Sequence, residues 1–142
     1  MASGKSSLAL ELAKACGFVV LHTDDFIYGD DEAKSYVERL DLPRLKKRLN
    51  QPSARSSVTL IEGICLRQVA SQASIQVSLF IYVKRISETG VWHDGVHLED
   101  FEAGIEANGD EPELSHMVYH ANVRPHEIAC FEIQWAESNN AA

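Results

Sequence analysis

The most constraining feature of the sequence is the string Met1-Ala2-Ser3-Gly4-Lys5-Ser6-Ser7 at its start. This string has the form of the second half of a phosphate-binding loop, whose full pattern is G-x-x-x-x-G-K-S/T. In that pattern the glycine lets the backbone approach a polyphosphate, the lysine reaches the β- and γ-phosphates, and the hydroxyl binds Mg²⁺. The first glycine of the pattern would lie before Met1. We therefore expect a nucleotide site, complete or vestigial, and a chance match in a polar N-terminus is the alternative.

The residues after this string follow the order that the motif requires. The segment 7–16 is rich in leucine and alanine, and Gly17 stands where a helix commonly ends. The run 18–22 is apolar and predicts a buried parallel strand. Loop, helix and strand in this order are the context of a phosphate loop. The strand that should precede the loop is missing from the sequence, so we expect an N-terminally truncated form.

Acidic residues follow both of the first two predicted strands. Asp24 and Asp25 come after the strand at 18–22, and Glu62-Gly63 ends an apolar run at 58–61. In an open parallel sheet, ligands bind at the carboxyl ends of the strands. There, Asp24 or Asp25 can take a proton from a substrate hydroxyl or assist a metal, and Glu62 occupies the Walker-B position. The alternative is that these carboxylates only cap turns.

Taken together, these motifs resemble those of the P-loop small-molecule kinases related to uridine kinase and phosphoribulokinase. The string Gly4-Lys5-Ser6-Ser7 resembles the end of their phosphate loop, and Asp24-Asp25-Phe26 with Tyr28 resembles their Asp-Asp-Phe-Tyr element. Glu62-Gly63-Ile64 resembles their Glu-Gly-Ile strand end. The segment Tyr119 to His126 is similar to the Tyr-His-x-x-x-Arg-Pro stretch before their last strand. The matches extend from residue 4 to about residue 135.

The resemblance implies ATP and Mg²⁺ as cofactors and a hydroxyl of a nucleoside, sugar or vitamin-like metabolite as the phosphate acceptor. It implies Lys5 and Asp25 as catalytic residues, with Asp25 as the general base. It further implies these sets: Ser3, Gly4, Lys5, Ser6, Ser7 and Arg85 for ATP; Asp24, Tyr28, Glu62, His120 and Arg124 for the acceptor; Ser6 and Glu62 for the metal. Arg85 is the only arginine near 87–95, where the family usually carries an arginine-bearing lid, so the set of cations is small.

The expected fold is α/β, a single three-layer P-loop NTPase-type domain over residues 1–142 with a parallel sheet and a frayed tail at 138–142. We expect strands at 18–22, 58–61, 77–83 and 129–135, and helices at 7–16, 33–40, 43–49, 100–108 and 113–123. The family's strand order, 2-3-1-4-5, puts the missing central strand between 58–61 and 77–83. These two strands should then lie about 9–10 Å apart, or be pulled together. Without a donated strand, the chain should aggregate or melt broadly.

Composition limits the class of protein and its partners. The 142 residues are 45% hydrophobic, which suits one domain with a core, and no stretch is apolar enough to span a membrane. The 13 Lys and Arg against 21 Asp and Glu give a net charge of −8, which argues against a nucleic-acid surface. The three cysteines, Cys16, Cys65 and Cys130, lack C-x-x-C spacing. They predict reduced, buried thiols in a cytoplasmic protein. The oligomeric state stays undetermined.

Other clusters of charged, histidine and tryptophan residues have simpler interpretations. The cations of 44–48 lie on a short amphipathic helix and predict a solvated face. The pairs His93/His97 and His116/His120 have spacing that a zinc site can use, but no Cys or Glu completes a tetrahedral set. We expect ordinary surface or substrate-pocket histidines. Trp92 and Trp135 are expected to pack in the core or in a lid, rather than stack on bases.

Two alternative functions stay open. A chain that lacks half of its phosphate loop can be a catalytically impaired or inactive remnant that acts as a nucleotide-binding or interaction protein. An ATPase or GTPase switch is less favoured, because Asp24-Asp25-Phe26-x-Tyr28 resembles an acceptor pocket and the sequence has no guanine-reading motif.

Overall fold

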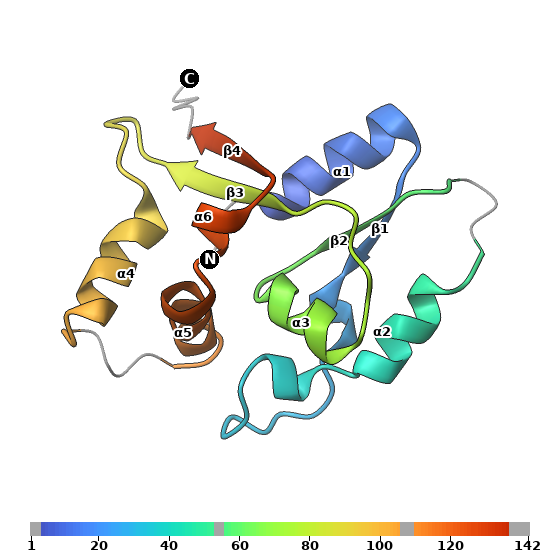
Figure 1. The fold of residues 1–142 in the computed structure, drawn as a ribbon, viewed down its shortest axis with the longest axis horizontal. Helices are drawn as coiled ribbons and strands as arrows, with labels where there is room; N and C mark the ends of the chain where they lie inside the picture. Colours follow the sequence, from blue (N-terminus) through green and yellow to red (C-terminus); the bar gives the residue numbers. More distant parts are fainter. Residues whose placement is uncertain (1–3, 53–55, 106–109, 137–142) are drawn as a thin grey trace. The chain divides into compact units, whose positions relative to one another are not determined.

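A computed structural model describes residues 4–52, 56–105 and 110–136 (Figure 1). Its elements in chain order are α1 Lys5–Cys16, β1 Val19–His22, the 3₁₀ helix η1 Thr23–Phe26, the 3₁₀ helix η2 Val37–Arg39, α2 Leu42–Leu49, β2 Thr59–Glu62, α3 Leu66–Gln72, β3 Ile81–Ile86, α4 His93–Glu102, α5 Glu113–Val123, α6 Pro125–Ile128 and β4 Phe131–Ala136. The predicted ATP-binding residue Ser3 and the predicted tail at 138–142 lie outside the described residues.

The elements group into two compact units, each with its own sheet. The N-terminal unit is Lys5–Val77, and the C-terminal unit holds the described residues from Ser78 onward together with Gly4. Each unit contains one parallel sheet of two strands, β1 with β2 and β3 with β4, and helices. The α/β class is therefore confirmed. That residues 1–142 form a single domain stays a prediction.

In the N-terminal unit, the predicted helix and strand follow each other in the expected order. Helix α1 begins at Lys5 and ends at Cys16, after which the Gly17 N–H donates to the Ala13 carbonyl at 2.8 Å. Strands β1 and β2 pair in register from Val19 opposite Thr59 to His22 opposite Glu62. Helix α1 packs against both strands. The strand predicted at 58–61 is thus shifted by one residue, which makes Glu62 its last member.

The helix predicted at 33–40 is wrong. Only the 3₁₀ turn Val37–Arg39 forms there, because tertiary and side-chain bonds draw the backbone out of an α-helix. The Ser35 N–H and hydroxyl both donate to the Glu38 carboxylate, at 2.9 and 2.6 Å. Ile27 and Leu40 form an antiparallel bridge, and the Tyr28 N–H donates to the Arg39 carbonyl at 2.9 Å.

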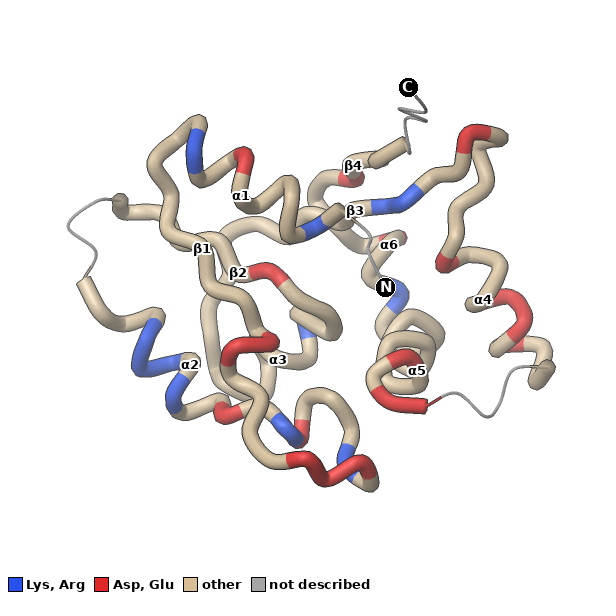
Figure 2. Tube along the Cα trace, turned by 180° about the vertical axis from the view of Figure 1, so that it is seen from behind, with Lys and Arg blue, Asp and Glu red and all other residues tan. Residues whose placement is uncertain are grey.

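Helix α2 agrees with its prediction. The Asp41 side chain caps it by accepting from the Arg44 N–H at 3.0 Å, and Pro43 occupies an early position that has no need of a donor. Leu45 on the inward face is fully buried. The basic residues of this helix are exposed, as expected, and Figure 2 shows them as blue segments along α2.

In the C-terminal unit, β3 and β4 pair from Ile81 opposite Phe131 to Ile86 opposite Ala136. The strand predicted at 77–83 therefore begins too early, because pairing with β4 starts only at Ile81. The Phe80 carbonyl accepts from the Cys130 N–H at 3.0 Å just before this ladder begins. The preceding Val77 and Leu79 are 37% and 46% exposed. The last predicted strand is likewise shifted, to Phe131–Ala136.

The late helices were predicted in part. Helix α5 occupies the predicted 113–123, whereas the helix predicted at 100–108 agrees with the structure only at 100–102, the end of α4. Helix α4 begins at His93 and leaves the helical path at Ala103, whose N–H donates to the Glu99 carbonyl at 2.9 Å. The end of the predicted segment, 106–108, lies outside the described residues. Helices α3 and α6 were not predicted.

Two further observations bear on the predictions. Within residues 4–52, 56–105 and 110–136, the strands pair as β1 with β2 and β3 with β4. The predicted spacing between the strands at 58–61 and 77–83 stays a prediction. No helix in these ranges is long and apolar enough to cross a membrane.

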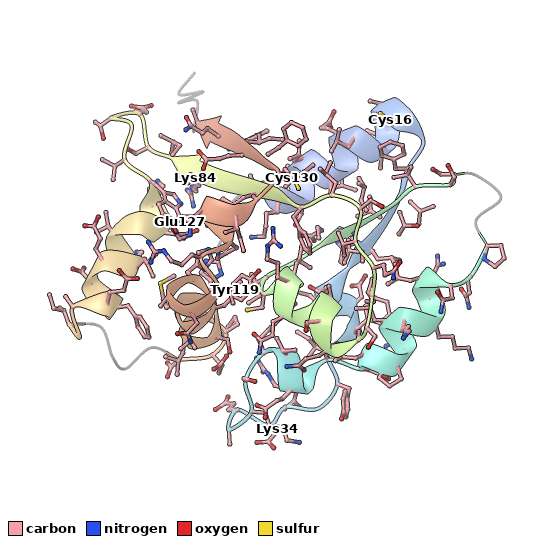
Figure 3. The ribbon with its side chains drawn as sticks, in the orientation of Figure 1. Cys16, Lys34, Lys84, Tyr119, Glu127 and Cys130 are labelled. Atoms are coloured by element: carbon pink, nitrogen blue, oxygen red, sulfur yellow. The ribbon has the colours of Figure 1, made fainter. Side chains whose placement is uncertain are left out.

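The expectation of three buried thiols is wrong for two of the cysteines. Cys65 is buried, but Cys16 and Cys130 are exposed. Figure 3 shows the reason: Cys16 lies at the end of α1, and Cys130 directly before β4. All three cysteines are free of disulfides.

Candidate functional site

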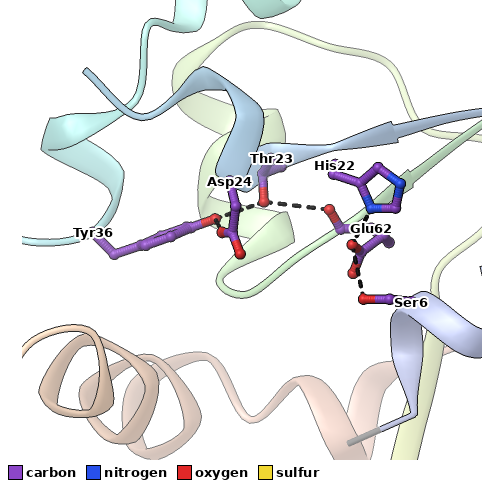
Figure 4. Close-up of polar contacts among 6 residues, drawn as sticks. All are labelled: Ser6, His22, Thr23, Asp24, Tyr36 and Glu62. Atoms are coloured by element: carbon purple, nitrogen blue, oxygen red, sulfur yellow. Dashed lines mark hydrogen bonds and ion pairs between the residues drawn. The ribbon is translucent and has the colours of Figure 1, made fainter. Parts of the chain in front are cut away.

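Polar side chains meet where β1 and β2 end. The last residues of the two strands, His22 and Glu62, are partners in the parallel register. Because parallel strands end at the same edge of a sheet, the segment after β1 also reaches this place. Figure 4 shows the resulting group, which we call the β-end network: Ser6, His22, Thr23, Asp24, Tyr36 and Glu62.

Glu62 joins the predicted phosphate loop to the sheet. The Ser6 hydroxyl, in the first turn of α1, donates to Glu62 Oε1 at 3.1 Å. The same carboxylate oxygen is hydrogen-bonded to Nδ1 of His22. The Glu62 side chain is 15% exposed. Hydroxyl and carboxylate oxygens are ligands that Mg²⁺ accepts, and it usually binds one or two carboxylates while retaining several waters. Ser6 and Glu62 therefore have the chemistry and the proximity that their predicted role as metal ligands needs.

A second part of the β-end network leads from buried Thr23 to the surface. The Tyr36 hydroxyl lies 2.6 Å from Thr23 Oγ1 and donates to Asp24 Oδ1 at 2.7 Å. Since Tyr36 has one hydroxyl proton, Thr23 is the donor in their mutual bond. Thr23 and Tyr36 are 0% and 2% exposed. Burial raises the pKa of the Tyr36 phenol far above its usual value, so the phenol remains a donor.

The turn after Glu62 lies directly against this network. Thr23 Oγ1 lies 3.3 Å from the Glu62 carbonyl oxygen. Gly63 has a φ of +155°, and a Cβ atom built on it would lie 1.8 Å from Thr23 Oγ1. No side chain fits at that distance. The glycine of the Glu-Gly pair, expected from the sequence at a strand end, is therefore required here by close packing.

Asp24 and Asp25 differ in their surroundings. Both are exposed, but only the Asp24 carboxylate belongs to the β-end network. The Asp25 carboxylate makes no hydrogen bond or ion pair with a described residue, and its backbone carbonyl accepts from Arg44 Nη1 at 3.3 Å. The Arg44 guanidinium also lies 5.1 Å from the centre of the Phe26 ring. Tyr28, predicted in the acceptor pocket, is 61% exposed.

Three predicted site residues, Arg85, His120 and Arg124, belong to the C-terminal unit. Arg85 lies within β3, in register with Trp135, and not in the lid segment. Arg124 has a left-handed backbone with a φ of +49°. Its guanidinium forms ion pairs with Glu102 at 2.8 Å and Glu127 at 2.7 Å. These bonds raise the pKa of Arg124, with Glu127 as the main contributor. Its charge is thus already matched within its own unit.

His120 is buried in the C-terminal unit, contrary to the expectation of a surface or pocket histidine. It is 2% exposed; its Nε2 lies 2.7 Å from Tyr82 Oη and its Nδ1 2.7 Å from the His116 carbonyl. Since a carbonyl only accepts, Nδ1 carries the proton and Nε2 accepts from Tyr82. Burial lowers the pKa of His120 to about 4 and raises that of Tyr82. His120 is therefore neutral at pH 7.

Other members of this buried cluster surround His120. His116 is 6% exposed, which also contradicts the surface expectation, and its Nε2 lies 3.5 Å from Oδ2 of Asp94. The ring centroids of Trp92 and His126 are 4.9 Å apart, so the half-buried Trp92 packs against this cluster. Trp135 is 42% exposed, so its predicted core position is wrong. No group of three or more His, Cys, Asp or Glu side chains suited to a metal occurs in the described part of the chain.

Several residues of the β-end network were not identified from the sequence. His22 lies in an apolar strand, and Thr23 next to it is a common residue type. Tyr36 lies in a segment that the sequence predicts as helical. The only local signal was the adjacency of His22 and Thr23 to Asp24. Their partners, Glu62 and Tyr36, are distant in sequence, so only the tertiary structure reveals these contacts.

Comparison with known proteins provides no relative. No family model matches the chain, and no curated protein and no solved structure shows significant similarity to it. The functional argument therefore depends on the residues and their geometry.

Proposed function

We propose that the chain is an ATP-dependent phosphotransferase acting on a hydroxyl of a small metabolite such as a nucleoside, a sugar or a vitamin-like compound. The observation that carries this proposal is the hydrogen bond between Ser6 and Glu62. These two residues were assigned separately to a phosphate loop and to a Walker-B position. In P-loop proteins the loop hydroxyl and the Walker-B carboxylate serve the same Mg²⁺, so their proximity supports the joint assignment.

The start of α1 has the groups needed to hold a nucleotide phosphate. Lys5 is the first residue of this 12-residue helix, and Ser6 follows it. Backbone N–H groups at a helix N-terminus bind anions, and a lysine adds a full positive charge. Mg-ATP, when bound, supplies the phosphoryl group together with a cation that neutralises its charge. Lys5 would orient the phosphates, and Ser6 and Glu62 would hold the metal.

Asp24 is the better candidate for the general base, although the sequence favoured Asp25. Its carboxylate is held by Tyr36, in the network that also contains Ser6 and Glu62. In the proposed step, the acceptor oxygen forms a bond to the γ-phosphorus, the bond from that phosphorus to the bridging oxygen breaks, and ADP leaves. Asp24 takes the acceptor proton. The exposed Tyr28, four residues later, would line the acceptor side.

The strand pairing supports a P-loop NTPase-type fold for the complete sheet. In a sheet of order 2-3-1-4-5, removal of the central strand leaves one pair of strands on each side. The observed pairs are β1 with β2 and β3 with β4, both parallel. These pairs correspond to 2-3 and 4-5 of that order.

A matched pair of variants tests the proposal. Purified protein is incubated with Mg-ATP and a panel of nucleosides, sugars and vitamin-like alcohols, and ADP formation is followed. Asp24→Asn should lower kcat by about 10²–10⁴-fold without weakening Mg-ATP binding. Asp25→Asn, the same change one residue away, should retain most of the rate. The reverse result would return the role of base to Asp25, and an absence of ADP formation with every acceptor would contradict the enzyme proposal.

A second candidate is a nucleotide-binding or interaction protein without catalytic activity. One observation favours it: over the described ranges, β2 and β3 each have a partner on one edge only. A strand with an unpaired edge can bind an extended segment of another chain. Titration calorimetry with Mg-ATP together with native mass spectrometry separates the two candidates. Binding of nucleotide or a partner without ADP formation would favour this second function.

A further inference from the structure

We infer that Tyr36 is a positioning residue that holds the Asp24 carboxylate in its working orientation. This inference rests on the proposed function, in which Asp24 accepts the proton of the acceptor hydroxyl. Tyr36 lies in a segment to which the sequence assigned no chemistry. Its hydroxyl bonds both to Thr23 and to the Asp24 carboxylate, and its effect on the reaction would be exerted through Asp24.

The hydrogen bonds at Tyr36 have a fixed direction. The Thr23 hydroxyl donates to Tyr36 Oη over 2.6 Å, and the Tyr36 hydroxyl donates to Asp24 Oδ1 over 2.7 Å. The chain of donors therefore ends on the carboxylate, which as an anion can only accept. A hydrogen bond to a charged group is stronger than one between neutral groups. The second carboxylate oxygen of Asp24 stays available for a substrate proton.

The backbone around Tyr36 keeps its hydroxyl in place. The segment 28–41 is closed at its base by the bridge between Ile27 and Leu40, and the Asp41 N–H donates to the Phe26 carbonyl at 2.8 Å. Tyr36 is 2% exposed, so packing also restricts the ring. A buried ring on a closed segment loses little entropy when it holds a partner. The segment 28–41 thus acts as a support for the exposed carboxylate.

Removal of the single hydroxyl tests this role. In Tyr36→Phe the ring remains, but the Asp24 carboxylate loses its donor and the Thr23 hydroxyl keeps only the Glu62 carbonyl, 3.3 Å away, as an acceptor. We expect kcat to fall about ten- to hundredfold, the range for a lost bond to a charged group, while KM for Mg-ATP stays unchanged. Thr23→Val should give a smaller decrease of kcat, because it leaves the Tyr36–Asp24 bond in place.

Tyr82→Phe is the matched control. It also deletes a buried phenol hydroxyl, the one that lies 2.7 Å from His120 Nε2 in the C-terminal unit. It should lower thermal stability to a similar extent, yet leave kcat at the wild-type value. An equal loss of kcat in both variants would mean that Tyr36 acts only through stability, and would overturn the inference.

Hydrogen exchange on the complete chain without ligands separates this inference from the proposed function. We expect Tyr36→Phe to accelerate amide exchange in 23–27 and 35–41, and Tyr82→Phe to leave these segments unchanged. If wild-type protein transfers no phosphate but exchange changes as expected, the proposed function fails and the support of Asp24 by Tyr36 stands. If exchange is unaltered, or if Tyr36→Phe keeps full kcat while Asp24→Asn loses it, the inference fails.

Discussion

The two units use polar side chains in opposite ways. In the N-terminal unit, hydrogen bonds lead from buried Thr23 through Tyr36 to the exposed Asp24. In the C-terminal unit, the bond between Tyr82 and His120 is enclosed, and both nitrogens of the histidine have internal partners. A network with one end at the surface can exchange protons with a substrate. An enclosed network contributes to packing and stability only. Both networks nevertheless contain residue types that are common in active sites.

The comparison also concerns charge. The β-end network ends in two carboxylates, Asp24 and Glu62, which accept hydrogen bonds from Tyr36 and Ser6. His120 at the centre of the C-terminal cluster is held neutral by burial, which lowers its pKa to about 4. We therefore expect the stability of the N-terminal unit to depend on close packing at the site. The stability of the C-terminal unit should fall in acid. Three predictions sharpen or break this contrast.

The largest effect is expected from Gly63→Ala. A Cβ atom at this position would lie 1.8 Å from Thr23 Oγ1, so Thr23 would be displaced and its bond to Tyr36 broken. We expect the free energy of unfolding to fall by about 3 kcal/mol or more, at the upper end for overpacking. Urea denaturation measures this change. Any phosphotransferase activity should be lost with it.

Gly29→Ala is the control for Gly63→Ala. Gly29 also has a positive φ, +74°, but a Cβ atom there would meet no atom within 4 Å. Gly29→Ala should lower the free energy of unfolding only by the backbone strain, about 1–2 kcal/mol, and should preserve the β-end network. Equal destabilisation by the two variants would show that close packing against Thr23 is unimportant.

The second effect is acid destabilisation of the C-terminal unit. The pKa of His120 is about 4 when folded, against an ordinary value of 6.5, so the unfolded chain binds the extra proton first. The resulting stability is complete above about pH 6.5 and is lost as the pH falls toward 4. The expected loss is about 3 kcal/mol at most. Burial also lowers the pKa of His126, which adds to the effect in the same direction.

Denaturant unfolding between about pH 7 and pH 4, together with NMR titration of the histidine rings, measures this effect. His120 should stay neutral down to about pH 4 in the folded protein. His93→Gln, a change at an exposed position, should leave the pH profile as it is. Protonation of His120 near pH 6.5 without unfolding would show that the Tyr82–His120 pair is not enclosed. The difference between the two units would then disappear.

The smallest effect is expected from Lys84→Met. Lys84 Nζ lies 2.7 Å from Glu132 Oε2 and 4.7 Å from the centre of the Trp92 ring. Methionine keeps the apolar stem, so the loss should be about 1 kcal/mol and should shrink in high salt. Lys34→Met removes a more exposed ion pair, with Asp31 at 3.5 Å, and should cost almost nothing. Thermal melts at low and high salt compare the two.

Local sequence patterns were sufficient for some elements and insufficient for others. The helices at 5–16, 42–49 and 113–123 follow from leucine spacing, an Asp41 cap and helix-forming residues. The segment 33–40 has a similar composition, but the Tyr36 hydrogen bonds and the bridge between Ile27 and Leu40 determine its conformation. The start of β3 depends on its register with β4, which no pattern within 77–83 indicates.

The candidate site was predictable where a motif has intrinsic chemistry. Ser6 and Glu62 were assigned from separate motifs, and the structure brings them into contact. His120 and Arg124 were assigned from one segment, yet burial and two ion pairs occupy them within their own unit. The sequence pattern cannot distinguish an exposed histidine from an enclosed one. That distinction depends on which face of α5 is turned inward.

The contact between Gly63 and Thr23 has a consequence for how related sequences can vary. A lineage that replaced Gly63 by alanine would have to give up the γ-oxygen at position 23, because the two atoms would occupy the same space. It would then also lose the hydroxyl that donates to Tyr36, while the bond from Tyr36 to Asp24 would remain. Substitutions at 23, 36 and 63 are therefore tolerated in combination rather than one by one, and these positions should covary as a triplet among descendants of this chain.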